Sequence, residues 1–256
     1  MSELDRIARE YLEDISRLDP LSALERGDLR FASGMTDFSP EGETERAELA
    51  IGARRKVEES LQATDSDGTA WAAMTERLGI AIDLFEAGEW MRGLSVFGPQ
   101  LQIRQTFVQM PTTGESDWLL IADKLSAVPE AMLRFRRSVA AGLAEGPTVA
   151  RRQVLACAAQ TRNWSGGGAG PGFFTTLVQA YRGGDSKLAE RLTELGRQAD
   201  SAYLDFTIYL EKEYAPLAKR QDGVGRERYQ LYCRQYNGLE LDLEETYSFG
   251  WEELAR

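Results

Sequence analysis

Residues 186–214 read SKLAERLTELGRQADSAYLDFTIYLEKEY, and this stretch decides the fold class of the chain. Its apolar residues alternate in steps of four and three, at Leu188, Leu192, Leu195, Ala199, Ala202, Phe206 and Tyr209. Such spacing places all of them on one face of a single helix. At 1.5 Å per residue that helix would be about 40 Å long. A helix of this kind typically forms the spine of an antiparallel bundle, and we expect Pro216 to end it.

Helical periodicity extends over most of the remaining sequence. The first amphipathic helix is expected over Leu4–Ile15, and Ser39-Pro40 reads as the capped start of a helix that continues to about Leu61. Short helices are expected over Gln100–Met110 and Glu115–Ser126. Pro129 is expected to begin another, because proline is disfavoured inside a helix. The sequence therefore predicts an all-α fold, a multi-helix antiparallel bundle or array that is incomplete as given.

A Gly-rich stretch, Ser165–Gly172, is the predicted place for a division of the chain, since its glycines favour a flexible loop. Residues 1–164 would form a helical N-terminal subdomain, and residues 173–256 a long-helix segment that continues into a missing C-terminal half. The two parts could also form one domain joined by this loop. A phosphate-cradling loop is the functional alternative, but the stretch lacks the Lys-Ser/Thr of a P-loop.

The last helical pattern begins after Asp242, a favourable N-cap residue, and still runs at Arg256. No C-cap glycine or polar tail follows it. We therefore expect the chain to be a truncated piece of a longer protein, cut inside a helix.

Composition and charge restrict the kinds of partner. The chain has 256 residues with 41 acidic and 30 basic side chains, a net charge of −11, which argues against nucleic acid as a ligand. No apolar run is long enough to predict a membrane span. The start, Met1–Asp5, has neither the basic nor the apolar region of a secretory signal. We expect a cytoplasmic protein with no nucleic-acid or membrane partner.

The chain contains no histidine, which limits its chemistry. Ser-His-Asp and Cys-His nucleophile systems are excluded within it, as are histidine-based zinc sites. The two cysteines, Cys157 and Cys233, are too few for a four-cysteine site and are interpreted as small buried hydrophobic residues in a reducing compartment. We predict no catalytic residue, no metal ligand and no cofactor in this chain.

Two groups of charged residues remain open to a functional interpretation. Glu245 and Glu252 lie on roughly one face of the last helix and could bind a hard cation, although a solvated face is favoured. A modest basic patch could meet an anionic group, but neutralisation of acids on adjacent helices is the preferred interpretation; it consists of Arg134, Arg136, Arg137, Arg151 and Arg152. A carboxylate-only enzyme, glycosidase-like or Mg²⁺-dependent, is a further alternative that requires two acids to converge in a pocket.

Several short motifs together resemble one large bacterial family. They include Asp19-Pro20, Asp37–Gly42 (DFSPEG), Phe97-Gly98-Pro99, Met110-Pro111, Gly223–Gly225 with Tyr229, and the closing stretch Glu244–Leu254 (EETYSFGWEEL). Taken together they look like the N-terminal half of the domain-of-unknown-function 885 family, over essentially the whole chain.

Members of that family are similar to zincin-type metallopeptidases, are largely helical and are about twice this length. The resemblance implies zinc and a metallopeptidase or other hydrolase activity for the intact bacterial protein. The His/Glu zinc motif belongs to the other half, so no zinc ligand carries over to a position in this chain, and this chain alone is not expected to be active. The implied partners are the C-terminal half of its own full-length chain and a peptide substrate.

Zincin-like helical peptidases commonly hold the substrate in a channel between two helical halves, so the resemblance implies that this segment supplies one wall. Tyr229 and Trp251 are our candidates for lining that channel, against the alternative that both are packing residues. A self-sufficient helical binding or scaffold module without catalysis is the alternative function. It would have a complete polar surface, whereas a docking half would expose apolar residues.

Overall fold

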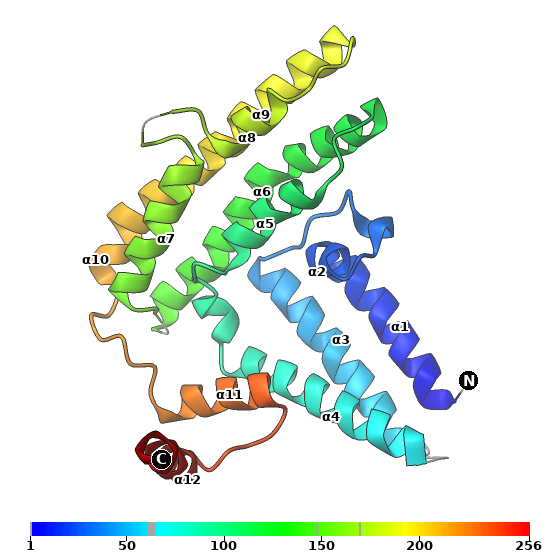
Figure 1. Cartoon of the computed structure of the whole chain (residues 1–256), viewed down its shortest axis with the longest axis vertical. Helices are drawn as coiled ribbons and strands as arrows, with labels where there is room; N and C mark the ends of the chain where they lie inside the picture. The colour runs from blue at the N-terminus through cyan, green and yellow to red at the C-terminus, as the bar shows by residue number, and fades with distance from the viewer. Residues whose placement is uncertain (1, 61–64, 147, 169) are drawn as a thin grey trace. The chain divides into compact units, whose positions relative to one another are not determined.

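The computed structural model describes residues 2–60, 65–146, 148–168 and 170–256. Helices make up nearly all of the regular structure in these ranges (Figure 1), which contain no β-strand and one isolated β-bridge between Ala150 and Lys219. The predicted all-α fold class is confirmed. No helix in the described ranges combines the length and the apolarity needed to cross a membrane.

The chain forms two compact units. Unit 1 consists of Met1–Leu12, Ala47–Ala87 and Gly223–Arg256, and unit 2 consists of Glu13–Arg46 and Gly88–Asp222. The predicted subdomain boundary at residues 165–172 lies within unit 2 and stays a prediction. The same stretch contains residue 169, which is outside the described ranges.

Unit 2 contains most of the helices. In chain order they are α2 (Pro20–Glu25), η1 (Leu29–Phe31), η2 (Glu89–Arg92), α5 (Pro99–Gln109), α6 (Glu115–Glu145), α7 (Arg151–Trp164), α8 (Phe173–Val178), α9 (Ser186–Tyr209), the π-helical turn η3 (Leu210–Tyr214) and α10 (Ala215–Leu217). Two further helices, α1 (Glu3–Leu18) and α3 (Pro40–Glu59), have residues in both units.

The central helix of unit 2 is α9, as its apolar periodicity predicts. Leu188, Leu192, Ala199, Phe206 and Tyr209 are buried in the main core, and the other two stripe residues pack against that core. The helical path continues through η3 into α10, so Pro216 lies inside the last short helix rather than directly after the end of the long one.

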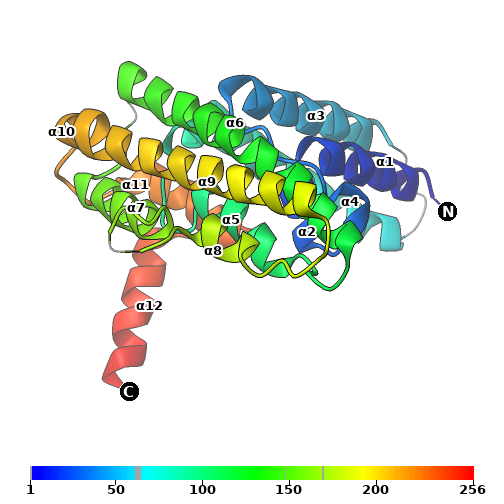
Figure 2. The same ribbon diagram turned by 90° about the horizontal axis from the view of Figure 1, so that it is seen from above.

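The neighbours of α9 run in both directions. Helices α6 and α9 lie side by side in both views (Figures 1 and 2). Near the start of both helices, Asp123 of α6 pairs with Arg191 of α9. Further along, Arg136 of α6 pairs with Glu213 in the turn that follows α9, so the two helices run parallel. Helix α7 is antiparallel to α9, because Thr161 meets Thr207 whereas the later Trp164 meets the earlier Tyr203. Helix α9 therefore has one parallel neighbour, α6, and one antiparallel neighbour, α7. The two longest helices of the unit, α6 and α9, can be parallel because α7 and α8 lie between them in the sequence.

The separate helices predicted before and after Pro129 are one continuous helix, α6, and that prediction is wrong. A proline inside a helix removes one backbone hydrogen bond and crowds the preceding turn. In α6 the apolar face continues through the proline, with Ile121, Leu125 and Val128 buried before it and Met132 and Phe135 buried after it. Burial of this uninterrupted face outweighs the local cost of the proline.

The DFSPEG motif at residues 37–42 joins the start of α3 to α6 within unit 2. The Ser39 hydroxyl accepts a hydrogen bond from the Gly42 amide, which confirms the predicted cap of α3. The Phe38 carbonyl accepts from the Ser138 hydroxyl at 2.6 Å, and Asp37 pairs with Arg134. A Cβ atom at Gly42 would lie 2.4 Å from the Asp37 carbonyl oxygen, so the turn is closed too tightly for any other residue.

Unit 1 has a small core between parts of α1, α3 and α4 (Asp65–Glu86). Its buried residues are Leu4, Ile7, Ala50, Ala53, Val57, Leu78 and Ile82. The unit ends with α11 (Arg226–Asn237) and α12 (Leu243–Ala255), and Asp242 caps α12 as predicted by accepting hydrogen bonds from the Glu244 and Glu245 amides. Neither α11 nor α12 has a buried residue.

Candidate functional site

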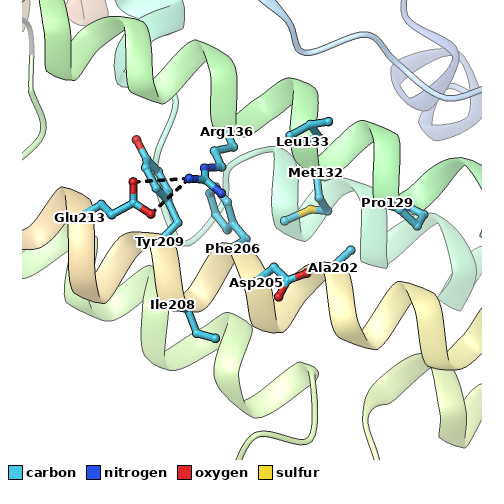
Figure 3. Close-up of a pocket in the computed structure, with 10 residues that line it drawn as sticks. All are labelled: Pro129, Met132, Leu133, Arg136, Ala202, Asp205, Phe206, Ile208, Tyr209 and Glu213. Carbon is cyan, nitrogen blue, oxygen red and sulfur yellow. Dashed lines mark hydrogen bonds and ion pairs between the residues drawn. The ribbon is translucent and has the colours of Figure 1, made fainter.

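A pocket of about 360 Å³ lies between α6 and α9 in unit 2 (Figure 3). Its residues come from two stretches, one around Pro129 and one at the C-terminal end of α9 with the following π-helical turn. The full lining is Pro129, Met132, Leu133, Arg136, Ala202, Asp205, Phe206, Ile208, Tyr209 and Glu213. Single π-helical turns inside α-helices occur frequently at functional sites, which makes this end of α9 the first place to look for a ligand.

The polar end of the pocket is built around Arg136. Its Nη2 atom lies 3.2 Å and 3.4 Å from the two carboxylate oxygens of Glu213, and its guanidinium carbon lies 4.3 Å from the centre of the Tyr209 ring. Figure 3 shows these three side chains converging from α6 and from the α9–η3 helix. The guanidinium is thus held between a carboxylate and an aromatic face, a rigid arrangement.

Tyr209 is buried, and its hydroxyl has no hydrogen-bond partner in the described part of the chain. Burial raises the pKa of Tyr209 to about 12, with the neighbouring Tyr214 adding to the shift. The phenol therefore stays protonated at neutral pH and can act only as a hydrogen-bonding group.

The rest of the pocket is apolar on its inner side. Met132 and Phe206 are buried, Leu133 and Ile208 are about half exposed at 52% and 45%, and Asp205 is exposed. The Asp205 carboxylate has no hydrogen bond or ion pair with a described residue. A concave site with an apolar wall and a few convergent polar groups suits an amphipathic small molecule or an apolar side chain of a peptide.

The basic patch predicted at residues 134–152 is mostly neutralised by acids on other elements, as preferred from the sequence. Arg134 pairs with Asp37 and Glu130, and Arg136 with Glu213. The remaining pairs join Arg137 to Glu41 and Arg152 to Asp222. Only Arg136 of this group lines the pocket.

The two residues predicted to line a channel lie in unit 1. Tyr229 is on α11 with 55% of its surface exposed, and Trp251 is on α12 with 57% exposed. The Trp251 ring packs edge to face against Tyr247, with 6.1 Å between ring centres. Neither residue is buried in the core of this chain, so packing within it does not explain them, and their role in a channel stays a prediction.

Most of the exposed large apolar side chains in the described part of unit 1 lie on helices α11 and α12. On α12 the exposed fractions are 65% for Tyr247, 58% for Phe249, 57% for Trp251 and 76% for Leu254. On α11, Tyr236 is 82% exposed. Large exposed apolar side chains of this kind are typical of interaction surfaces.

A polar contact, not an apolar core, holds α11 to unit 1. The Arg234 guanidinium donates to both carboxylate oxygens of Glu76, at 2.9 Å and 2.8 Å, and to Asp83 at 2.6 Å. Arg77 donates to the carbonyl oxygens of Arg234 and Gln235 at the end of α11. Tyr229 and Tyr236 of α11 and the aromatic residues of α12 remain exposed.

The sequence analysis identified some of the pocket residues, but not the pocket. Phe206 and Tyr209 were in the apolar stripe and Arg136 was in the basic patch, but nothing in the sequence places the three together. The continuous α6 is what brings Arg136 to the end of α9, and a helix start at Pro129 was expected instead.

Three comparisons with known proteins bear on the chain. A search of curated proteins found no match. A solved structure titled "The crystal structure of the putative lipoprotein from Colwellia psychrerythraea" is similar over 100% of this chain, with a TM-score of 0.75 and 16% sequence identity. At that identity the likeness concerns the fold alone. The chain spans 49% of the length of that solved structure.

The third comparison used family profiles. A profile described as "Bacterial protein of unknown function (DUF885)" matches residues 20–256. That range includes the DFSPEG turn, the pocket residues and both helices with the exposed aromatic face. The chain therefore belongs to the DUF885 family.

Proposed function

We propose that this chain is the helical N-terminal portion of a bacterial hydrolase that resembles zinc metallopeptidases. In this proposal it forms one wall of a substrate channel, binds and positions a peptide, and is inactive alone. Its principal partner is the C-terminal half of its own full-length chain. Its contribution to catalysis is substrate positioning and the exclusion of water, not bond breaking.

The uncovered aromatic face of α11 and α12 carries this proposal. A 13-residue helix is marginal in water by itself, and most helices in proteins are stabilised by burying an apolar face. Helix α12 buries no residue, yet it carries Tyr247, Trp251 and Leu254 at helical spacing on one face. A partner must cover this face, and a relative of the same fold with about twice the length supports a partner from the same polypeptide.

The donor groups of this chain do not fit a zinc site. The sequence has no histidine, and no three Cys, Asp or Glu residues in the described ranges are grouped as metal ligands. We assign no zinc ligand to these residues, and zinc enters the proposal only as the metal that the family resemblance implies for the intact protein.

Tyr229 and Trp251 are the proposed channel residues. Both present large aromatic surfaces to solvent, and each combines an apolar ring with one hydrogen-bond donor. Such side chains hold a peptide by stacking and by donating to its carbonyl groups. Trp251→Leu and Tyr229→Phe in the full-length protein would raise KM for peptides more than they lower kcat.

The proposal is tested by comparing the full-length gene product with residues 1–256. Peptide mixtures are incubated with each protein, with and without added zinc, and hydrolysis is followed by mass spectrometry. We expect hydrolysis only by the longer product. Hydrogen exchange of the amides in α11 and α12 should be fast in residues 1–256 and strongly slowed in the longer product. Peptide turnover by residues 1–256 at about 1 s⁻¹, an ordinary enzymatic rate, would overturn the proposal, as would slow exchange of α12 in a monomer of these residues.

The second candidate function is a self-sufficient helical binding or scaffold module. The observation that favours it is the pocket between α6 and α9, which is complete within unit 2. A gene product that ends at Arg256 and binds a ligand there without hydrolysing it would support this alternative.

The cellular location stays a proposal as well. We propose a cytoplasmic location, with which two cysteines that form no disulfide are compatible. The similar protein from Colwellia psychrerythraea is described as a lipoprotein, and cell fractionation of the full-length product distinguishes the two locations.

A further inference from the structure

Arg104 on α5 is a partly buried cation that has no acidic partner among the described residues. Its guanidinium carbon lies 4.1 Å from the centre of the Phe173 ring and 4.9 Å from the centre of the Trp164 ring. Trp164 ends α7 and Phe173 begins α8, so these two rings stand at the two ends of the Gly-rich segment. The arginine is thus placed by three different helices of unit 2.

The hydrogen-bonding groups of Arg104 are unused in the described part of the chain. Its Nε atom is buried and has no hydrogen-bond acceptor, and no ion pair to the guanidinium is present there. The contrast with Arg162 on α7 is informative, because that guanidinium makes a two-pronged contact with the Glu211 carboxylate at 3.1 Å and 2.6 Å. Many arginines of this unit pair with an acid, whereas Arg104 pairs with none of the described acids.

The polar groups nearest to Arg104 already have partners. The Tyr203 hydroxyl donates to the Gln100 carbonyl at 2.6 Å, and the buried Asp200 carboxylate accepts hydrogen bonds from the Phe174 and Thr175 amides. Burial lowers the pKa of Arg104, with Tyr203 opposing the shift. The aromatic rings offset part of the desolvation of the cation, but they cannot accept the in-plane N–H groups.

We propose that Arg104 anchors an oxyanion-binding site, for a carboxylate or a phosphate group. An oxyanion in the plane of the guanidinium would accept the N–H groups that have no partner, in the bidentate geometry typical of arginine. The Trp164 and Phe173 rings hold the guanidinium in place, so less side-chain freedom is lost on binding. Arg104 is partly exposed although its Nε atom is buried, so the anion approaches the guanidinium from solvent at the edge formed by the two Nη atoms. This site is separate from the pocket between α6 and α9 and does not depend on the proposed peptidase function.

The test uses the 256-residue protein labelled with ¹⁵N-arginine. The Nε–Hε resonance of Arg104 is followed by NMR during titration with sodium acetate or sodium phosphate, at an ionic strength held constant with sodium chloride. We expect a saturable shift of this resonance with at least one of the two anions and none with chloride alone. Saturation with acetate identifies a carboxylate site, and saturation with phosphate identifies a phosphate site.

Two variants supply the controls. Arg104→Lys keeps the positive charge but removes the planar N–H donors that bind an oxyanion at two points. We expect it to weaken anion binding by about tenfold or more, as measured from the anion-dependent rise in Tm. Arg220→Met removes an exposed arginine of the same unit and should leave the affinity unchanged. If Arg104→Lys does not fold, Phe173→Leu assigns the resonance by removing one ring. The absence of any saturable shift with either anion would overturn the proposal, as would equal Tm increases in the wild type and a folded Arg104→Lys variant.

Discussion

Asp200 shows how much of unit 2 depends on single buried side chains. Its carboxylate accepts hydrogen bonds from the Phe174 and Thr175 amides, both at 3.0 Å, and so caps the first turn of α8 from the middle of α9. Burial raises the pKa of this carboxyl, although these hydrogen bonds oppose the shift. The two helices can approach this closely only because residue 172 is glycine. A Cβ atom at that position would lie 2.2 Å from the Asp200 carboxylate carbon.

Gly172→Ala should therefore destabilise unit 2. The new methyl group would displace the carboxylate and leave buried amides of α8 without an acceptor, at a cost of about 2 kcal/mol or more. Urea unfolding measures the change. Gly170→Ala lies in the same segment with nothing within 4 Å of the added Cβ, and its stability should remain within about 0.5 kcal/mol of the wild type.

Lys124 gives the protein a defined pH dependence. Its ammonium group is fully buried and donates to the Ala32 and Gly34 carbonyls at 3.2 Å and 2.7 Å, and burial lowers its pKa to about 8. The folded protein loses this proton near pH 8, whereas the unfolded chain keeps it up to the ordinary pKa of 10.5. Between these values the unfolded chain binds more protons, so the contribution of Lys124 to stability increases with pH.

Lys124→Met removes this pH dependence. The free energy of unfolding of the wild type, minus that of the variant, should increase by about 2 kcal/mol between pH 7.5 and pH 10. Taking the difference cancels the titration of the other groups. Parallel curves for the two proteins would show that the ammonium group is not desolvated.

At the scale of elements, the sequence predicts the presence of helices well, but it predicts their boundaries and their packing poorly. The stripe of α9 and the caps at Ser39 and Asp242 are local patterns, and each is found where it was predicted. The predicted helix boundary at Pro129 is wrong. The free-energy cost of a proline in a helix is local, whereas the burial of the apolar face of α6 depends on helices distant in sequence. The pocket could not be predicted for the same reason, since it exists only where α6 passes the end of α9.

Pro129→Ala tests this account of α6. It restores a backbone N–H in the interior of a continuous helix and should stabilise the protein by about 1–2 kcal/mol, after allowance for the greater freedom of the unfolded chain. Chemical unfolding measures the gain. A loss of stability would mean that the proline ring contributes more to packing at the pocket than the missing hydrogen bond costs.

At the scale of the whole molecule, the two units differ in how completely they bury their apolar residues. Unit 2 has an extensive aromatic core in which the Phe174 ring contacts both Phe107 and Tyr203. Unit 1 has a small core, and its last two helices bury nothing. In the function proposed above, the exposed apolar residues of unit 1 form the surface that meets the C-terminal half.

Trp251→Glu distinguishes the two proposed roles of this side chain, contact with a C-terminal half and binding of a peptide. In residues 1–256 this exposed position should tolerate the charge, with a change in stability within about 0.5 kcal/mol. In the full-length protein, burial of an unpaired carboxylate would cost about 3 kcal/mol or more if Trp251 lies in the contact between halves. An unchanged Tm with an increased KM for peptides would instead place Trp251 in the open channel.

The two thiols differ in accessibility, which allows the proposed contact with a C-terminal half to be followed by chemical labelling. Cys157 is completely buried, and burial raises its pKa to about 12, so it stays an unreactive thiol at neutral pH. Cys233 is partly exposed on α11, one residue before the arginine that fastens this helix to α4. A maleimide dye would therefore label the native polypeptide at a single position without any engineered cysteine, and its emission would report whether the proposed partner buries α11.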